Sequence, residues 1–334
     1  MASPKAAAGV CSMTLSSKPE RAIIHEHVDL VTGLHSCIVF YARMERELRT
    51  FRDAVDSNEF TLTAELNLAR RVDAQTLLKQ VEMLGPLVDA IQTTDNPYSQ
   101  VQISSLAAAS LILGGGFDAV AQFTCRDRNR TALASDLLGA KALGVKSVLV
   151  LRGDGYKNPK DTKAVFDLDA KELIAKARSL SGADGFYIGG VATVFKPVAG
   201  WQPDELNAKA EAGAQFIQTQ LCFDTNVLRR YMEHLVSAKL TWRTHIVIGV
   251  ATLPSAEAAR WLQRNLRGAL MPDTLVERME QAQDPEAEGV RICAELLEEF
   301  TEIPGVSGAN IMTLGSVETI PAAISASGLR AVAK

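Results

Sequence analysis

The sequence predicts a (β/α)8 barrel, and three observations support this fold class. From residue 60 onward, a short apolar run, a polar or glycine-containing loop and an amphipathic helix follow one another repeatedly, and the unit occurs eight times. Strands that alternate with helices predict parallel pairing with right-handed crossovers, and eight such units in about 270 residues match a barrel. A doubly wound open sheet is the alternative, but it usually carries a glycine-rich loop after its first strand, and "AELNLARR" has none.

The predicted strands and helices follow from the spacing of apolar residues along the chain. Strands are expected at residues 60–66, 88–93, 117–123, 145–151, 184–190, 214–220, 244–250 and 305–314. Helices are expected where apolar residues recur at spacings of three and four, including residues 73–85, 129–144, 169–180, 203–213 and 255–266. Gly85, Gly144 and Gly213 close three of these helices, so each is expected to adopt the left-handed conformation that suits a helix C-terminus.

Residues 1–58 fall outside this rhythm and are predicted to form a mostly helical N-terminal extension, followed by the barrel domain over residues 59–334. The extension could cap the bottom of the barrel or contribute to an interface between subunits. The sequence leaves both roles open, and with them the expectation of a homo-oligomer.

Composition and charge exclude several classes of protein. The 334 residues are 47% hydrophobic and 22% charged, with a formal net charge of −4, which argues against a nucleic-acid-binding surface. No apolar stretch is long enough to span a bilayer, and the N-terminus lacks the apolar core of a secretory signal. The five cysteines are scattered and never form a CxxC pair, which predicts a reduced cytoplasmic protein without a disulfide framework or a metal site.

Polar residues at the C-terminal ends of the predicted strands are the candidates for an active site, because barrels of this type build their sites there. The first strand ends at a carboxylate, Glu65, and a second carboxylate, Asp154, lies beside a loop arginine after the fourth strand. These carboxylates and several neutral amides suit a polar heteroaromatic ligand. No histidine falls at a strand end, so a Ser-His-Asp triad is not predicted. The other candidates are Thr93, Thr94, Asp95, Asn96, Gln122, Thr124, Cys125, Arg126, Asp127, Arg128, Arg152, Gln218, Gln220 and Asp224.

Each candidate also has a purely structural interpretation. Glu65 could form a salt bridge at the barrel mouth, and residues 152–154 could be a charged turn. Residues 125–130, "CRDRNR", could be a solvated charged run in which Asp127 caps the next helix. Gln220 could be a satisfied polar group inside the barrel, and Cys222 is interpreted as a small buried hydrophobic residue.

Taken together, these motifs resemble the methylenetetrahydrofolate reductase family over residues 58–330. The landmarks are "TAELNL", "TTDNP", "QFTCRDRNRTALASDLLGAKALGVKSVLVLRGD", "KAEAGAQFIQTQLCFD" and "IMTLGSVETIPAAISASGL". The agreement of the third and fourth motifs, in order and at the right separation, is the specific part of the resemblance. The sequence is most similar to the branch found in acetogens and in chains fused to homocysteine methyltransferases.

The resemblance implies a reaction and its cofactors. Members of the family reduce 5,10-methylenetetrahydrofolate to 5-methyltetrahydrofolate in one-carbon metabolism and methionine biosynthesis, usually through a flavin that NADH or NADPH reduces. FAD is the first expectation and FMN the second, with direct hydride transfer from the nicotinamide as a third. The direction of the reaction in the cell stays open. A folate-binding methyltransferase barrel and a non-catalytic subunit are the alternative functions.

The resemblance also assigns roles to individual residues. Glu65 matches the general acid that protonates the departing nitrogen of the folate. Asp154 matches a carboxylate near the pyrimidine edge of the flavin, where it would tune hydride donation. The other implied cofactor contacts are Thr94, Gln122, Thr124, Arg152, Gly153 and Lys209. The implied folate contacts besides Glu65 are Asn96, Gln220 and Phe223.

The sequence departs from the family pattern at four places. A proline pair is replaced by residues 66–68, and the fifth strand offers Val191, Ala192 and Phe195 where a proline dipeptide and a histidine are common. Gln122 stands in place of a histidine, and Gly315 or Ser316 in place of an arginine. These departures bear on the identity of the cofactor more than on the class of reaction, because Glu65, Asp154 and Gln220 are kept.

Overall fold

A computed structural model of the chain describes residues 49–66, 68, 72–155, 162–182 and 185–330. The predicted N-terminal extension therefore lies almost entirely outside the described residues, and its helical character stays a prediction. The described part of the chain belongs to one compact unit, Glu47–Lys334.

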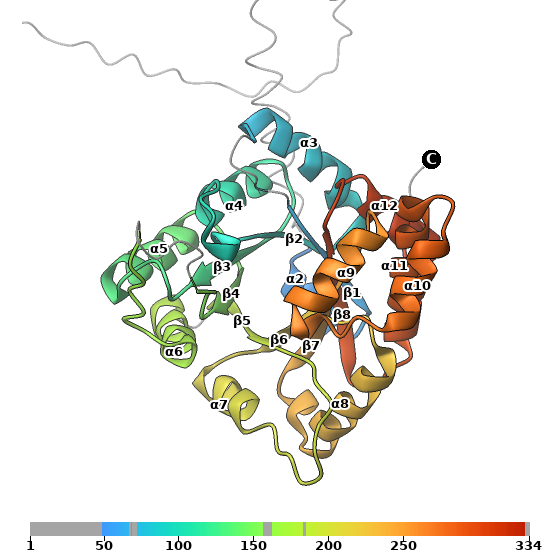
Figure 1. Ribbon diagram of the computed structural model, residues 1–334. Coiled ribbons are helices and arrows are strands. Elements are labelled where there is room, and N and C mark those ends of the chain that lie inside the picture. The colour runs from blue at the N-terminus through green and yellow to red at the C-terminus, as the bar shows by residue number, and fades with distance from the viewer. Residues whose placement is uncertain (1–48, 67, 69–71, 156–161, 183–184, 331–334) are drawn as a thin grey trace, which may run out of the picture. The chain divides into compact units, whose positions relative to one another are not determined.

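Eight parallel strands form a closed barrel in chain order, which confirms the predicted fold class (Figure 1). Each strand pairs with the next, and β8 returns to β1 with Thr63 opposite Asn310. All eight predicted strands are present, with ends that differ by a few residues. They are β1 (Thr61–Glu65), β2 (Ala90–Thr93), β3 (Ala119–Thr124), β4 (Ser147–Leu151), β5 (Tyr187–Ala192), β6 (Phe216–Leu221), β7 (His245–Thr252) and β8 (Val306–Thr313).

Helices surround the barrel on the outside of the strands (Figure 1). The α-helices of the described residues are α2 (Phe51–Asp56), α3 (Ala74–Leu84), α4 (Ser105–Gly114), α5 (Arg130–Ala142), α6 (Ala170–Ser181), α7 (Asp204–Ala212), α8 (Thr225–Ser237), α9 (Ala256–Asn265), α10 (Asp273–Gln281), α11 (Pro285–Thr301) and α12 (Thr319–Ala326). Short 3-10 helices are η1 (Gly85–Leu87), η2 (Pro97–Ser99), η3 (Leu240–Trp242) and η4 (Arg267–Ala269). The connection from β7 to β8 is the longest, because it holds α9, α10 and α11.

Side-chain caps explain where several helices begin. A side-chain oxygen of the N-cap residue accepts a hydrogen bond from the first turn of α3, α4, α5, α6, α8, α9 and α11. Helix α5 is capped by Asn129, whose side chain accepts from Ala132 N. The interpretation of Asp127 as this cap was wrong, because α5 begins two residues later than that role requires and the Asp127 carboxylate pairs with Arg126.

Two of the three predicted left-handed glycines are confirmed. Gly144 and Gly213 have φ angles of 87° and 121°. Gly85 does not, because its φ is −54° and it begins η1. A Cβ atom at Gly85 would lie 2.4 Å from the ring of Phe117, so close packing accounts for this glycine and backbone handedness does not.

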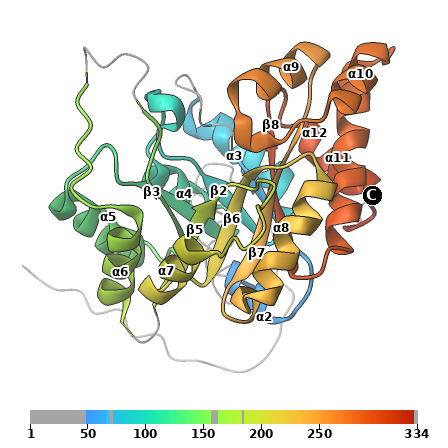
Figure 2. The same cartoon turned by 60° about the horizontal axis from the view of Figure 1, so that its bottom comes forward.

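The lower end of the barrel is filled by apolar side chains and closed by α2 (Figure 2). Phe51 of α2 is fully buried, with its ring edge-on to Tyr187 at 5.6 Å and to Phe216 at 5.3 Å. The backbone N–H of Phe51 donates to Asp118 at 2.7 Å, which fixes the start of the helix. Apolar packing therefore fills this end of the described barrel, and the cavity described below lies at the C-terminal ends of the strands.

Two features are absent from the described residues. Among them no helix combines the length and the apolar character needed to cross a bilayer. The same part of the chain contains no group of three or more histidine, cysteine, aspartate or glutamate residues arranged to hold a metal ion.

Candidate active site

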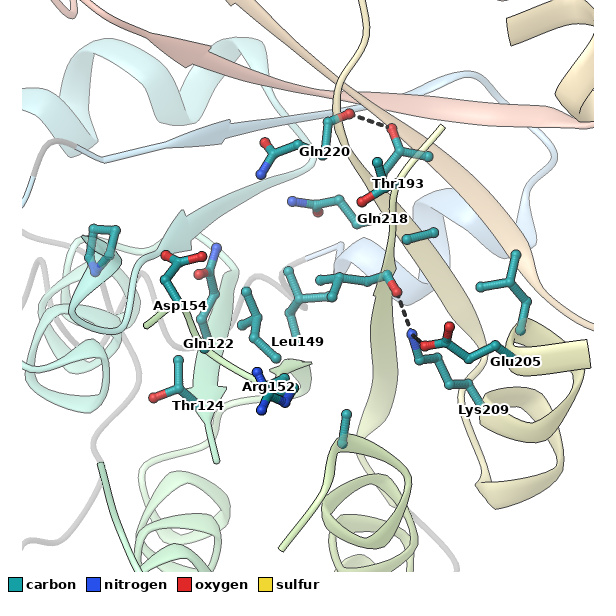
Figure 3. Close-up of a pocket in the computed structure, with 18 of the residues that line it drawn as sticks. Gln122, Thr124, Leu149, Arg152, Asp154, Thr193, Glu205, Lys209, Gln218 and Gln220 are labelled. Atoms are coloured by element: carbon teal, nitrogen blue, oxygen red, sulfur yellow. Dashed lines mark hydrogen bonds and ion pairs between the residues drawn. The ribbon is translucent and has the colours of Figure 1, made fainter. Parts of the chain in front are cut away.

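A cavity of about 1080 Å³ opens at the C-terminal ends of the strands. Ten of the eleven predicted site residues line it: Glu65, Thr94, Asn96, Gln122, Thr124, Arg152, Gly153, Asp154, Lys209 and Gln220. Figure 3 shows Gln122, Thr124 and Asp154 on one side of this cavity and Lys209 with Glu205 on the other. Phe223 is the exception, because its side chain is only 2% exposed and packs in the hydrophobic core behind β6.

Glu65, the last residue of β1, brings a carboxyl group to this cavity. Burial raises the pKa of its carboxyl group to about 7, against a hydrogen bond from Gln122 that favours the carboxylate. The Gln122 amide nitrogen donates to Glu65 Oε2 at 3.3 Å. Within the described residues Glu65 forms no ion pair, so the predicted alternative of a structural salt bridge at the barrel mouth has no support. A carboxyl group in this state can hold a proton near neutral pH and release it to a substrate.

Asp154 lies at the rim of the cavity, in the loop after β4. Its carboxylate accepts a hydrogen bond from the backbone N–H of Tyr98 at 3.2 Å, which joins the loop after β4 to the loop after β2. Gly153, just before it, has a φ of 91°, and a Cβ atom there would lie 2.8 Å from Arg126 Cβ. Both the backbone handedness and the close approach therefore require glycine at this position. Arg152 turns away from Asp154, and its guanidinium lies 4.5 Å from the ring centre of Phe166.

The run "CRDRNR" holds the rim of the cavity together. Arg126 is 1% exposed and donates to the backbone oxygens of Asn96 at 2.8 Å and Asp154 at 3.2 Å. It also pairs with Asp127 at 2.7 Å, so one guanidinium connects the loops after β2, β3 and β4. The interpretation of this run as a solvated charged surface was wrong for its first half, because Cys125 and Arg126 are buried.

Asp95 connects Thr124, the last residue of β3, to Arg128 of the same run. It is 5% exposed and accepts from Thr124 N at 2.7 Å and Thr124 Oγ1 at 3.1 Å. It also forms an ion pair with Arg128. Thr124 is thus held at the cavity by a buried carboxylate that is itself paired.

The opposite side of the cavity is formed by β5, β6 and α7. Lys209 of α7 is buried, and its ammonium donates to Val191 O at 2.7 Å and pairs with Glu205 at 2.9 Å. The first residues of α7 line the cavity, and its N-cap, Pro203, makes no side-chain capping bond. Gln220, near the end of β6, accepts from Leu221 N at 3.0 Å through its side-chain oxygen.

An aromatic wall, defined as Phe195, Trp201 and Tyr231, lines the same side and was not predicted. Trp201 stacks on Tyr231 at a centroid distance of 5.5 Å, and Phe195 lies edge-on to Trp201 at 5.0 Å and to Tyr231 at 5.5 Å. The residues come from the loop after β5 and from α8. No regular spacing in the sequence relates these three residues, and Phe195 was named only as a departure from the family pattern.

Comparison with known proteins identifies the family. The sequence profile described as "Methylenetetrahydrofolate reductase" matches residues 50–328. The chain belongs to this family. The match includes α2, all eight strands and α3 to α12, so the resemblance seen in the motifs extends over the whole barrel.

The chain is also similar to individual known proteins, including one curated relative and one solved structure. A "Probable methylenetetrahydrofolate reductase (NADPH)" of Caenorhabditis elegans is 31% identical over 137 residues, which are 40% of this chain and 20% of that protein. The match thus spans about a fifth of the length of the relative. A solved protein from Clostridium thermocellum, described as binding two copies of 5-methyl-5,6,7,8-tetrahydrofolic acid, superposes with a TM-score of 0.58 at 13% identity, covering 83% of this chain and 97% of the other. At that identity the superposition shows a shared fold.

Proposed function

We propose that this methylenetetrahydrofolate reductase family member reduces 5,10-methylenetetrahydrofolate to 5-methyltetrahydrofolate with electrons from NADH or NADPH. The observation that carries the proposal is Glu65, a carboxyl group with a pKa of about 7 at the floor of a large cavity in a barrel of this family. The C. elegans relative described as NADPH-dependent supports the class of reductant. The folate bound by the C. thermocellum protein supports a pterin as the occupant of such a barrel.

Glu65 supplies the proton that opens the folate ring in this proposal. The methylene carbon of the substrate is held between two nitrogens, and protonation of one nitrogen lets it depart and leaves an electrophilic iminium group. A carboxylic acid with a raised pKa in a site with little water performs this step efficiently near neutral pH. Gln220 and Asn96, which line the same cavity, offer neutral donors and acceptors to the amide-like edge of the pterin.

The residues present fit a flavin as the cofactor. Thr94, Gln122 and Thr124 offer hydroxyl and amide groups at the strand ends, and Gly153 presents backbone without a side chain. Lys209 is a cation on this side of the cavity, and a phosphate bound there would replace its ion pair with Glu205. A flavin bound here would supply the hydride after reduction by the nicotinamide. FAD is proposed first and FMN second, and the visible absorbance of the purified protein tests both against direct transfer from the nicotinamide.

The substitution Glu65→Gln tests the role of the acid. It keeps the shape of the side chain but cannot donate a proton, so formation of 5-methyltetrahydrofolate should fall by about 100-fold or more. Oxidation of NADH or NADPH by an artificial acceptor should continue, because that half-reaction needs no acid for the folate. The measurement is chromatographic assay of the folate product beside the spectrophotometric assay of nicotinamide oxidation. Equal loss of both half-reactions would contradict the role assigned to Glu65.

A further inference from the structure

A chain of hydrogen-bonded amides crosses the barrel interior directly below Glu65. The amide nitrogen of Gln122 on β3 donates both to Glu65 Oε2 at 3.3 Å and to Gln92 Oε1 at 3.4 Å. Gln92 on β2 is fully buried and is not among the residues that line the cavity. It can therefore act on a bound ligand only through its neighbours.

The remaining bonds of Gln92 fix the direction in which its amide points. Its amide nitrogen donates to Thr63 Oγ1 at 3.0 Å and to Gln218 Oε1 at 2.6 Å, which uses both of its hydrogens. Thr63 in turn donates its hydroxyl hydrogen to Asn310 Oδ1 at 2.8 Å, so its oxygen is left to accept from Gln92. The carbonyl oxygen of Gln92 is then the atom that it offers to Gln122.

The orientation of the Gln92 amide determines which group of the Gln122 amide faces Glu65. Because Gln122 gives one amide hydrogen to Gln92, its NH₂ group must face Glu65 and its carbonyl group must face elsewhere. A donor beside Oε2 favours the carboxylate and leaves the acid proton to the other oxygen, Oε1. If the Gln122 amide turned over, its carbonyl would accept a hydrogen bond from the protonated acid and would favour that form instead.

We propose that Gln92 is a positioning residue that sets the proton-donating state of Glu65 by holding the Gln122 amide in one orientation. This inference rests on the proposed function of Glu65 as the acid. It goes beyond that function because it assigns a role to a buried side chain that touches neither folate nor cofactor. Gln92 and Gln122 come from the adjacent strands β2 and β3, whereas Gln218 comes from β6, and the closed barrel brings the three amides together.

The charged groups around Glu65 do not compete with this amide chain. Tyr98, from the loop after β2, has a pKa raised by burial and by the charges of Asp154 and Glu65. Asp154 comes from the loop after β4, and its carboxylate accepts from Tyr98 N. Asp95 and Arg126 also line the cavity, but they are paired with Arg128 and Asp127. The strands β2, β3, β6 and β8 contribute neutral groups at this level, namely Gln92, Gln122, Gln218, Gln220, Asn310 and Met312.

The substitution Gln92→Met tests the proposal, because methionine has nearly the same shape but neither donates nor accepts the amide bonds. Gln122 then loses the acceptor that holds it, and the midpoint of the Glu65 titration should rise by about 0.5 to 1 pH unit. The readout is the carboxyl carbon signal of Glu65 in protein labelled with ¹³C-glutamate, assigned as the signal that Glu65→Gln removes. The alkaline limb of the pH profile of kcat/KM for folate reduction should move by the same amount.

Thr93→Val is the matched control. Thr93 is the next residue of β2 and is equally buried, but its hydroxyl points outward to Ser105 Oγ of α4 at 2.7 Å. The variant therefore loses one buried hydrogen bond on the same strand without reaching Glu65, and the midpoint should not move. Thr63→Val serves as a second variant if Gln92→Met does not fold, because it removes an acceptor from the same Gln92 amide and should raise the midpoint by a smaller amount.

Two results would overturn the proposal. The first is an unchanged Glu65 midpoint in Gln92→Met and Thr63→Val, and the second is an equal rise in Thr93→Val. A midpoint that moves while the alkaline limb of folate reduction stays where it was would instead contradict the proposed function of Glu65 as the acid. The carbon signal is measured without turnover, so the Glu65 midpoint can be followed even in a protein that reduces no folate. Failure of the proposed function and failure of the Gln92 proposal therefore give different results.

Discussion

At the scale of single residues, the site depends on a carboxyl group that is poorly solvated in its charged form. Burial raises the pKa of Glu65 to about 7, and the single donor from Gln122 offsets part of that effect. Because one pKa unit corresponds to about 1.4 kcal/mol, the charged form of Glu65 also costs the folded protein stability. The carboxyl group that we propose as the acid therefore lowers the stability of the folded protein at alkaline pH.

This cost gives a prediction that needs no substrate. The folded-state pKa of Glu65 lies above its ordinary value of 4.5, so the folded protein loses stability as pH rises from about 4.5 to about 7. Glu65→Gln removes the titrating group, and it should match the parent protein near pH 4.5 but exceed its stability by ~1 to 3 kcal/mol near pH 8. Thermal unfolding at the two pH values measures the difference.

The control for this prediction is Glu277→Gln. Glu277 is exposed on α10, so its substitution should change the unfolding temperature by a similar small amount at both pH values. A pH-independent effect of Glu65→Gln, equal to that of the control, would contradict the raised pKa.

Most of the site residues that the sequence predicted do line the cavity, because strand ends in a barrel converge and because strand side chains alternate. Gln122 and Thr124 are two residues apart, as are Gln218 and Gln220, and each pair points into the barrel. Gln92 is likewise two residues before Thr94. It lies inside an apolar run and not at the end of a strand, so it was not among the predicted site residues. The prediction for Phe223 was wrong, because this residue, two positions after the end of β6, is packed in the core and does not line the cavity.

At the scale of secondary-structure elements, the polar site sits above a sealed apolar floor. Helix α2 supplies Phe51 and Val55 to the cluster that includes Tyr187, Phe216 and Val247 at the lower end of the strands. The periodicity of the outer helices was visible in the sequence, whereas the one N-cap that it predicted, Asp127, was wrong. The docking of α2 was left open, because capping the bottom of the barrel was one of two roles that the sequence allowed for residues 1–58.

The role of α2 as a floor predicts a separation of stability from activity. Phe51→Ala should destabilise the protein by about 3 to 5 kcal/mol, because it removes a fully buried ring and leaves a cavity. Catalysis at a temperature where the variant stays folded should be close to normal, since Phe51 lies at the end of the barrel opposite the site. Denaturant unfolding and the folate assay measure the two effects.

Trp242→Ala is the matched control for the loss of an aromatic side chain. Trp242 is 75% exposed, so its removal should change stability by about 0.5 kcal/mol or less. If Phe51→Ala cost no more than this control, α2 would not be the structural floor of the barrel.

At the scale of the whole molecule, the side chains inside the barrel become more polar from its lower end to its open end. Apolar side chains fill the lower end, a layer of amides crosses the middle, and carboxylates, hydroxyls and aromatic rings surround the open end. The closed fold was predictable from eight repeated units. The aromatic wall was not, because Phe195, Trp201 and Tyr231 meet only after the loop following β5 folds back on α8.

The rate of 5-methyltetrahydrofolate formation as a function of pH tests the central claim most directly. If Glu65 must be protonated, kcat/KM for the folate should fall as pH rises through about 7, by up to about tenfold per pH unit above it. The same profile for Glu65→Gln should lose this limb together with most of the activity. A parent protein that forms the product at a rate independent of pH across this range, or a Glu65→Gln variant that keeps the limb, would contradict the assignment of Glu65 as the acid.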